Sequence, residues 1–267
     1  MKVFVHDAAK CCGCYQCQIS CKDEHCSNDW TPYAKPQPLT GQFWGKLNEY
    51  VIGTVPKVRM YYISQRCNHC DNPSCIPACP VEAIYKRDDG LVIIDPAKCT
   101  GCKLCIDACQ YESIYYNEGL NIAQKCTGCA HILDRGWPIT EPRCVDACPN
   151  ECLMFGEESG FSTQITQGEV LNPELGTEPR HYYLNIPKKF IGGTVYDPVT
   201  EEVVIGATCT LSGDKTATVT TDDFGDFWFE GLAAGSFSVK IESGGKVKTI
   251  DNISTEKDVN LGDIALS

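Results

Sequence analysis

Hydrophobic and polar residues alternate in two separate parts of the chain. Near the start, Val3, Phe4 and Val5 lie in a short apolar run over Lys2–Asp7 that predicts a β-strand. From Ile191 onward, short alternating segments are separated by turn residues. We expect strands at 193–196, 207–211, 216–220, 227–230, 236–241, 246–250 and 259–266. Short strands at this spacing are typical of a small antiparallel β-sandwich.

Cysteine spacing changes this picture for the first part of the chain, because 16 of the 20 cysteines fall into four groups. Each group has three cysteines close together and a fourth about one helical turn beyond. The groups are Cys11, Cys14, Cys17 and Cys21; Cys67, Cys70, Cys75 and Cys79; Cys99, Cys102, Cys105 and Cys109; and Cys126, Cys129, Cys144 and Cys148. In iron–sulfur proteins, three such thiolates hold one cubane, and the fourth holds the neighbouring cubane. Four groups therefore predict two pairs of clusters, and hence four 4Fe–4S clusters.

Two other uses of these cysteines are weaker. Structural zinc sites typically use two separated Cys-x-x-Cys pairs and have no need of the fourth spacing seen here. Disulfides are disfavoured because the cysteines within each group are crowded and the chain begins without a secretory segment.

The pairing of the four groups follows from their nesting. Groups two and three are separated by a short hairpin over 83–94, and a second hairpin over 113–123 follows group three, as in a duplicated bacterial ferredoxin. These two groups should exchange their fourth ligands, which leaves groups one and four to exchange theirs. The predicted ligand sets are Cys11, Cys14, Cys17 and Cys148; Cys21, Cys126, Cys129 and Cys144; Cys67, Cys70, Cys75 and Cys109; and Cys79, Cys99, Cys102 and Cys105.

A basic residue precedes the first cysteine of every group. These residues are Lys10, Arg66, Lys98 and Lys125. A cation beside an anionic cluster favours its reduced state, so we expect all four to tune the reduction potentials. An exposed charge flanking a loop would explain any single case.

The net charge of −12 argues against nucleic acid as a partner. Residues 1–190 hold 18 basic and 22 acidic residues, and residues 191–267 hold 5 and 13. No apolar run reaches the length of a transmembrane helix. Without a leading signal segment the chain is expected in the cytoplasm, and export together with a signal-bearing partner stays open.

We expect α+β architecture in three parts: a four-cluster ferredoxin-like domain over 1–155, an extended strap over 156–190 and the β-sandwich over 191–267. An insert at 22–66 carries many aromatic residues; it is either a folded loop over the first cluster pair or a docking surface. Pro173 and Pro179 argue against a helix in the strap. Most cysteines outside the groups should be buried free thiols; these are Cys12, Cys26, Cys152 and Cys209.

The four-group layout over 1–155 resembles the iron–sulfur subunits of the dimethyl sulfoxide reductase family of molybdopterin oxidoreductases. Further stretches resemble the small subunits of transhydroxylases that act on phenols. These stretches are 21–30, 91–96, 121–134 and 172–185, and the C-terminal part looks like a transthyretin-like or carboxypeptidase-regulatory domain. The resemblance implies a large partner, in a heterodimer or a multiple of it, that holds a molybdenum bis-molybdopterin guanine dinucleotide centre. It also implies that groups one and four lie toward that centre.

One departure bears on the reaction. Since transhydroxylation involves no net electron transfer, the transhydroxylase resemblance implies an impaired third group, yet all four of its cysteines are present. An intact electron path fits a reductive dehydroxylase of phenols at least as well. Three functions remain open: an electron-transfer subunit with no turnover of its own, a free-standing polyferredoxin, and a structural subunit. A subunit of another molybdopterin reductase is a variant of the first.

Overall fold

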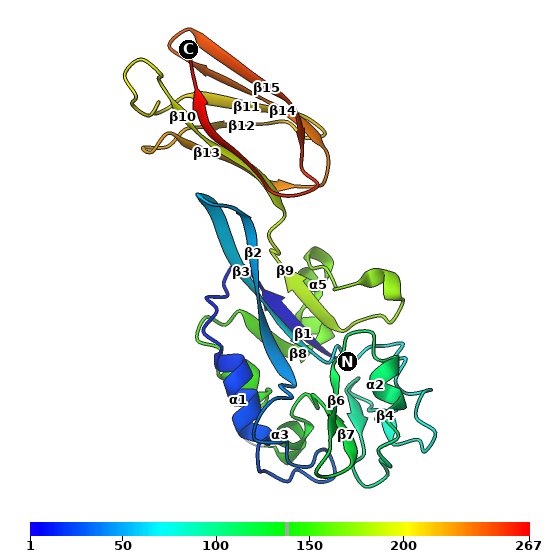
Figure 1. Cartoon of the computed structure of the whole chain (residues 1–267). Helices are drawn as coiled ribbons and strands as arrows, with labels where there is room; N and C mark the ends of the chain where they lie inside the picture. The colour runs from blue at the N-terminus through cyan, green and yellow to red at the C-terminus, as the bar shows by residue number, and fades with distance from the viewer. Residues whose placement is uncertain (137–138) are drawn as a thin grey trace. The chain divides into compact units, whose positions relative to one another are not determined.

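The computed structural model describes residues 1–136 and 139–267, and it divides the chain into two compact units. The first unit comprises Met1–Glu49 and Tyr61–Ile186, and the second comprises Tyr50–Met60 and Pro187–Ser267. Figure 1 traces the chain through its elements. No helix in the described residues is long and apolar enough to cross a membrane.

A three-stranded sheet of order β8-β1-β9 lies in the first unit (Figure 1). Strand β1 (Lys2–Asp7) forms where the alternation predicted it, and Val3, Phe4 and Val5 are buried. It pairs antiparallel with β8 (Leu153–Glu157) and parallel with β9 (His181–Leu184). The sheet therefore joins the start of the chain to residues that follow the last cysteine group.

Both predicted hairpins are confirmed. Strands β4 (Ile84–Lys86) and β5 (Val92–Ile94) pair antiparallel, and so do β6 (Ile114–Asn117) and β7 (Ile122–Lys125). Side chains from both hairpins pack in one hydrophobic cluster together with cysteines of groups two and three. This shared cluster is the packing expected of a duplicated unit.

Three of the cysteine loops enter a helix through a left-handed residue. Tyr15, Lys103 and Cys129 have φ values of 61°, 66° and 52°, and they directly precede the helices. The helices are α1 (Gln16–His25), α2 (Leu104–Ala108) and α3 (Ala130–Arg135).

The fourth cysteines differ in their local structure. Cys21 lies within α1, Cys109 caps α2, and Cys148 follows α4 (Arg143–Asp146). Cys79 follows a run of turns and not a helix, and Pro77, which has no backbone N–H to donate, lies inside this segment.

The insert at 22–66 contains a long antiparallel hairpin that the sequence did not predict. Its strands are β2 (Gly45–Thr54) and β3 (Lys57–Arg66). Most residues of β2 are partly or fully exposed, so the strand lacks the alternation by which strands are found. The end of this hairpin, Tyr50–Met60, belongs to the second unit and not to the first domain in which we expected it.

The segment 156–190 is more structured than an extended strap. It contains the end of β8, a 3-10 turn (η1, Glu158–Gly160), helix α5 (Ser162–Gln167), a second 3-10 turn (η2, Pro173–Leu175) and β9. Helix α5 ends before both prolines, and Pro173 is the first residue of η2, so neither proline interrupts a helix. Strand β9 pairs in parallel with β1, which lies near the start of the sequence, so no local pattern in 156–190 reveals this pairing.

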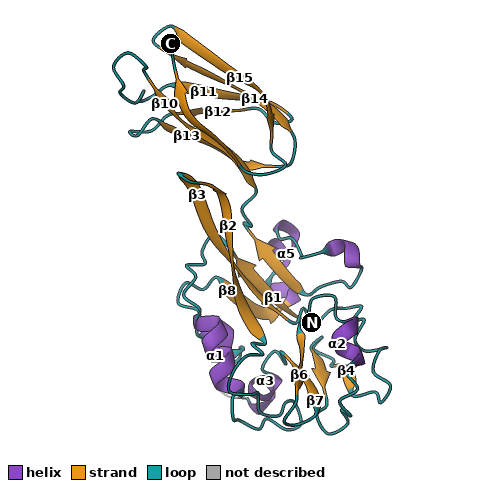
Figure 2. Ribbon diagram, viewed as in Figure 1, coloured by secondary structure: helices purple, strands orange, loops and turns teal. Residues whose placement is uncertain are grey.

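Residues 187–267 of the second unit form seven strands, one at each predicted segment. They are β10 (Lys189–Tyr196), β11 (Thr208–Gly213), β12 (Ala217–Thr220), β13 (Asp226–Leu232), β14 (Ser236–Ser243), β15 (Lys246–Ser254) and β16 (Val259–Ala265). They form two sheets, of orders β13-β10-β16 and β12-β11-β14-β15 (Figure 2). Buried side chains of both sheets form one hydrophobic cluster, which includes Ile191, Leu211, Phe229 and Val239.

Candidate metal centres

The first predicted ligand set, which we name site A, surrounds one cavity. Cys11, Cys14, Cys17 and Cys148 line a cavity of about 320 Å³. The first three lie on the loop before α1 and on its first turn, and Cys148 comes from the other end of the first unit. The fold thus brings together residues that are more than a hundred positions apart.

The second set, site B, is the most deeply buried. Its members are Cys21, Cys126, Cys129 and Cys144. Burial, followed by the neighbouring thiolates of Cys144 and Cys126, raises the pKa of Cys21, and burial likewise raises the pKa of Cys129. The Nε2 atom of His25 lies 3.8 Å from the Cys129 Sγ atom.

The third and fourth sets each surround a cavity of their own. Site C consists of Cys67, Cys70, Cys75 and Cys109, which line a cavity of about 390 Å³. Site D consists of Cys79, Cys99, Cys102 and Cys105, which line a cavity of about 290 Å³. Both mix three cysteines of one group with the fourth of the other, as the predicted exchange requires.

The surroundings of these thiols suit iron–sulfur clusters. Backbone N–H groups point at the sulfur atoms: Ala83 N lies 3.3 Å from Cys79 Sγ, and Ala123 N lies 3.3 Å from Cys99 Sγ. Such donors stabilise thiolates. Burial also raises the pKa of Cys70 and of Cys105 to about 12, so a positive metal core is needed to keep these residues deprotonated. The donor set and its surroundings therefore fit the cubanes that the spacing predicts.

No group of three or more His, Cys, Asp or Glu side chains within 1–136 and 139–267 has the geometry of a single-ion site.

The four basic residues that precede the cysteine groups separate into two kinds. Arg66 and Lys125 are 4% and 2% exposed, whereas Lys10 and Lys98 are exposed to solvent. The Arg66 Nη1 atom donates to Cys144 Sγ at 2.8 Å. Burial opposes the charge of Lys125, but the thiolates of Cys67, Cys75 and Cys126 outweigh it and raise the pKa of its ammonium group. For Lys10 and Lys98 the structure favours the simpler interpretation of an exposed charge flanking a loop.

Sequence reasoning missed two neighbours of site A. Cys152 is buried and its Sγ atom lies 3.3 Å from Cys148 Sγ, and Ser64, from the unpredicted strand β3, also lines the cavity. The spacing of four between Cys148 and Cys152 was the available signal for the first, and nothing local marked the second. Of the other cysteines outside the groups, Cys209 is buried, Cys26 is partly buried and Cys12 is exposed.

Two family models match the chain. The model described as "4Fe-4S dicluster domain" matches residues 58–158, and the model described as "Carboxypeptidase regulatory-like domain" matches residues 191–267. The first match covers cysteine groups two, three and four. The second coincides with the seven-stranded part of the second unit.

Curated relatives extend the likeness to the whole chain. The pyrogallol hydroxytransferase small subunit of Pelobacter acidigallici is 37% identical, over 98% of this chain and 98% of its own. One subunit of the tetrathionate reductase of Salmonella typhimurium is 34% identical, over 69% of this chain and 72% of its own. One subunit of the anaerobic dimethyl sulfoxide reductase of Shigella flexneri is 37% identical, over 57% of this chain and 72% of its own.

Proposed function

The chain belongs to the iron–sulfur electron-transfer subunits of the dimethyl sulfoxide reductase family of molybdopterin oxidoreductases, and from this membership we propose that it carries four 4Fe–4S clusters. One observation supports the number of four clusters: the cysteines of each predicted ligand set either line one cavity or are buried. Each set combines cysteines of two different groups. When bound, clusters of this kind accept and release single electrons.

The proposed partner is a large catalytic subunit with a molybdenum bis-molybdopterin guanine dinucleotide centre. The relative from Pelobacter is the small subunit of an enzyme named for pyrogallol, which supports a phenolic substrate for the complex. Substrate turnover belongs to the partner, and this chain supplies the electron path.

Two reactions fit this partner, a transhydroxylation and a reductive dehydroxylation of phenols. The complete set Cys99, Cys102, Cys105 and Cys109 favours a path that carries electrons through, and therefore the reductive reaction. A free-standing polyferredoxin is the alternative outside this class, and the tetrathionate and dimethyl sulfoxide reductase relatives keep another molybdopterin reductase open.

We further propose that residues 1–155 hold the clusters, that 156–190 brace them through β9, and that 191–267 form a β-sandwich, with the complex in the cytoplasm. Sites A and B, from groups one and four, would lie toward the catalytic centre, and sites C and D would lie farther out.

The decisive experiment is anaerobic purification through a tag on this chain, followed by iron, sulfide and molybdenum analysis. We expect about 16 iron and 16 sulfide per chain and a co-purifying large molybdenum subunit. A reproducible value near 12 would mean that one set does not assemble, and a chain that purifies alone with full iron would favour the polyferredoxin.

The order of the sites is tested by two ligand variants, and the fold of each is checked first because loss of a ligand can unfold a metal site. Cys14→Ala should disconnect the partner from external electron carriers, whereas Cys102→Ala should leave the inner sites reducible by the partner. Equal behaviour of the two would contradict the assigned order.

A further inference from the structure

Arg66 links site A to site B. Its side chain is buried, its Nη1 atom donates to Cys144 Sγ of site B at 2.8 Å, and its Nη2 atom donates to Ser64 Oγ. The Ser64 Oγ atom in turn lies 3.7 Å from Cys17 Sγ of site A. One guanidinium thus contacts one cluster set directly and the next through a buried hydroxyl.

Lys125 holds the equivalent place between site B and site C. Its backbone directly precedes Cys126 of site B, and its Nζ atom donates to the carbonyl oxygens of Val92 and of Cys126. The same side chain lines the cavity of site C together with the ligands Cys67 and Cys75. The ammonium group therefore lies against the ligands of two sets.

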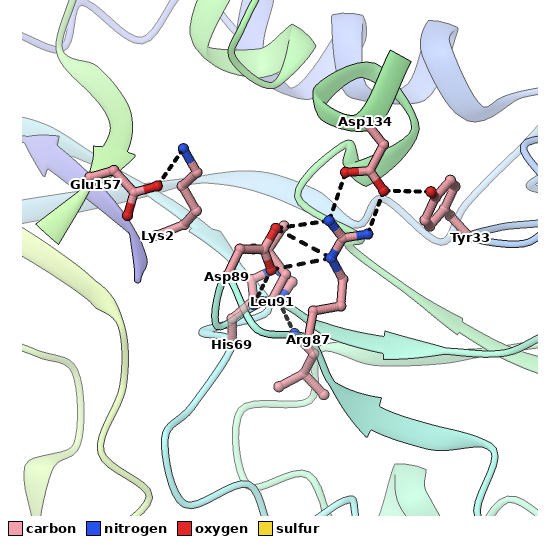
Figure 3. A network of polar contacts seen from close by, with 9 residues as sticks. Lys2, Tyr33, His69, Arg87, Asp89, Leu91, Asp134 and Glu157 are labelled. Atoms are coloured by element: carbon pink, nitrogen blue, oxygen red, sulfur yellow. Dashed lines mark hydrogen bonds and ion pairs between the residues drawn. The ribbon is translucent and has the colours of Figure 1, made fainter. Parts of the chain in front are cut away.

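Two other buried or half-buried arginines of the first unit, Arg87 and Arg180, have carboxylate partners. Arg87 makes paired hydrogen bonds with Asp89 and with Asp134, and Figure 3 shows this network with Tyr33. Arg180 is bound by Asp71 and Glu158. Within 1–136 and 139–267, no ion pair joins Arg66 or Lys125 to a carboxylate, and the Arg66 Nε atom is buried with no hydrogen-bond partner there.

A buried cation without a counter-ion is costly, and neutral thiols do not supply one. A cubane with four thiolates carries about −2 when oxidised and about −3 when reduced. Clusters in sites A, B and C would therefore place negative charge next to Arg66 and Lys125, which have no carboxylate partner among the described residues. Among the described residues that line the cavity of site D, the one cation is Lys103, and it is exposed.

We propose that Arg66 and Lys125 are shared counter-ions, each of which raises the reduction potentials of two neighbouring clusters, those of sites A and B for Arg66 and those of sites B and C for Lys125. This inference rests on the proposed function, because it requires cubanes in these sites. Each cluster accepts one electron, supplied in the test by dithionite through mediators, and neither side chain gains or loses a proton. A positive charge placed between two clusters attracts the electron added to either one, so it eases the reduction of both.

The test is a potentiometric titration of the intact complex followed by electron paramagnetic resonance. Arg66→Met should lower the equilibrium constant for reduction of two of the four clusters at least tenfold. For one electron this corresponds to a fall of about 59 mV in each reduction potential. Lys125→Met should lower the reduction potentials of two clusters, one of which is also affected by Arg66→Met. The double variant should lower the reduction potentials of three clusters. The chain supplies matched controls, because Lys10→Met and Lys98→Met remove exposed charges at the same position before a cysteine group and should shift none.

Variants that keep the charge separate electrostatics from packing. Arg66→Lys loses the fork that contacts Cys144 but stays cationic, so it should shift the same two clusters by less than Arg66→Met does. If Arg66→Met assembles fewer clusters, Arg66→Gln is titrated in its place.

Three outcomes would overturn the inference: no shift in a fully loaded Arg66→Met complex, an equal shift of all four clusters, or shifts as large in the Lys10 and Lys98 controls. A low iron count in the unaltered complex would instead contradict the proposed function, so the two failures are distinguishable.

Discussion

Buried cations of the two units differ in their partners, and the contrast is sharpest between Lys57 of the second unit and Arg66 and Lys125 of the first. In the second unit, Lys57 is 4% exposed, pairs with Asp226 and lies over the ring of Trp228 at 5.3 Å. In the first unit, Arg66 and Lys125 are as deeply buried but contact thiols and carbonyl oxygens. Lys57 therefore has its counter-ion within the second unit, whereas Arg66 and Lys125 would gain theirs from the proposed clusters.

The hydrophobic cores of the two units also differ in how far they involve the predicted cysteine ligands. The second unit has one continuous cluster that draws on both sheets. The described apolar side chains of the first unit form three separate hydrophobic clusters. Two of these include cysteines that we predict to be iron–sulfur ligands, such as Cys126 and Cys105. We infer that metal binding supplies much of the folding free energy of the first unit, and apolar burial that of the second.

Removal of iron should give the largest difference between the units. Oxidation and chelation of the anaerobic complex should unfold the first unit, because its ligand sets and buried cations lose their counter-charge. Residues 187–267 should keep their resistance to protease, measured by limited digestion and mass spectrometry against the untreated complex. Equal loss of both units would contradict the comparison.

A core truncation in the second unit should produce the reverse pattern. Phe229 is 2% exposed in the shared cluster, so Phe229→Ala should destabilise this unit by about 3–5 kcal/mol. The iron content should stay unchanged. Hydrogen exchange in urea over residues 187–267 measures the loss, and Val247→Ala, at a residue 50% exposed, is the control with an expected change within about 0.5 kcal/mol.

The Lys57–Asp226 pair should have a smaller, pH-dependent effect. Burial alone would raise the pKa of Asp226, but the hydrogen bonds from Lys57 and Thr194 outweigh it and hold the pKa below the ordinary 3.8. The stabilisation is therefore fully present above pH 3.8 and is lost as the pH falls through the lower folded value.

Asp226→Asn should accordingly destabilise the second unit by about 2 kcal/mol at neutral pH, and the difference from the unaltered chain should vanish in acid. Denaturation at a series of pH values measures it, with the exposed Asp251→Asn as control. A difference that persists unchanged below pH 3 would show that lost packing, and not the charge pair, is responsible.

The smallest effect is a difference in chemical reactivity between two thiols outside the predicted ligand sets, and it requires no change in stability. Cys209 lies in the core of the second unit, where burial raises its pKa to about 12, whereas Cys12 is exposed. Because the thiolate is the reactive form, iodoacetamide should modify Cys12 in the folded chain and spare Cys209 until the second unit unfolds. Peptide mapping gives the two rates, and similar rates in the folded chain would mean that the core opens readily.

Local patterns predicted much of the molecule. All seven strands within residues 187–267 and both small hairpins fall where alternation and turn residues indicated them. The hairpin β2–β3 was missed because its exposed residues leave no alternation, and helix α5 was missed because the prolines after it were given too much weight. Strand β9 pairs with β1 across most of the sequence, so its role was not visible locally.

The sequence by itself determined the chemistry, because cysteine spacing within a short loop is a local property that fixes which thiols can hold one cubane. It also determined the strands of the second unit, whose alternation is likewise local. The tertiary structure alone decided which of four equivalent basic residues became functional candidates. Burial of Arg66 and Lys125 depends on strands β3 and β7 packing between distant cysteine loops, whereas Lys10 and Lys98 remain in water. The approach of Cys152 and Ser64 to site A was decided in the same way, by contacts between segments far apart in the chain.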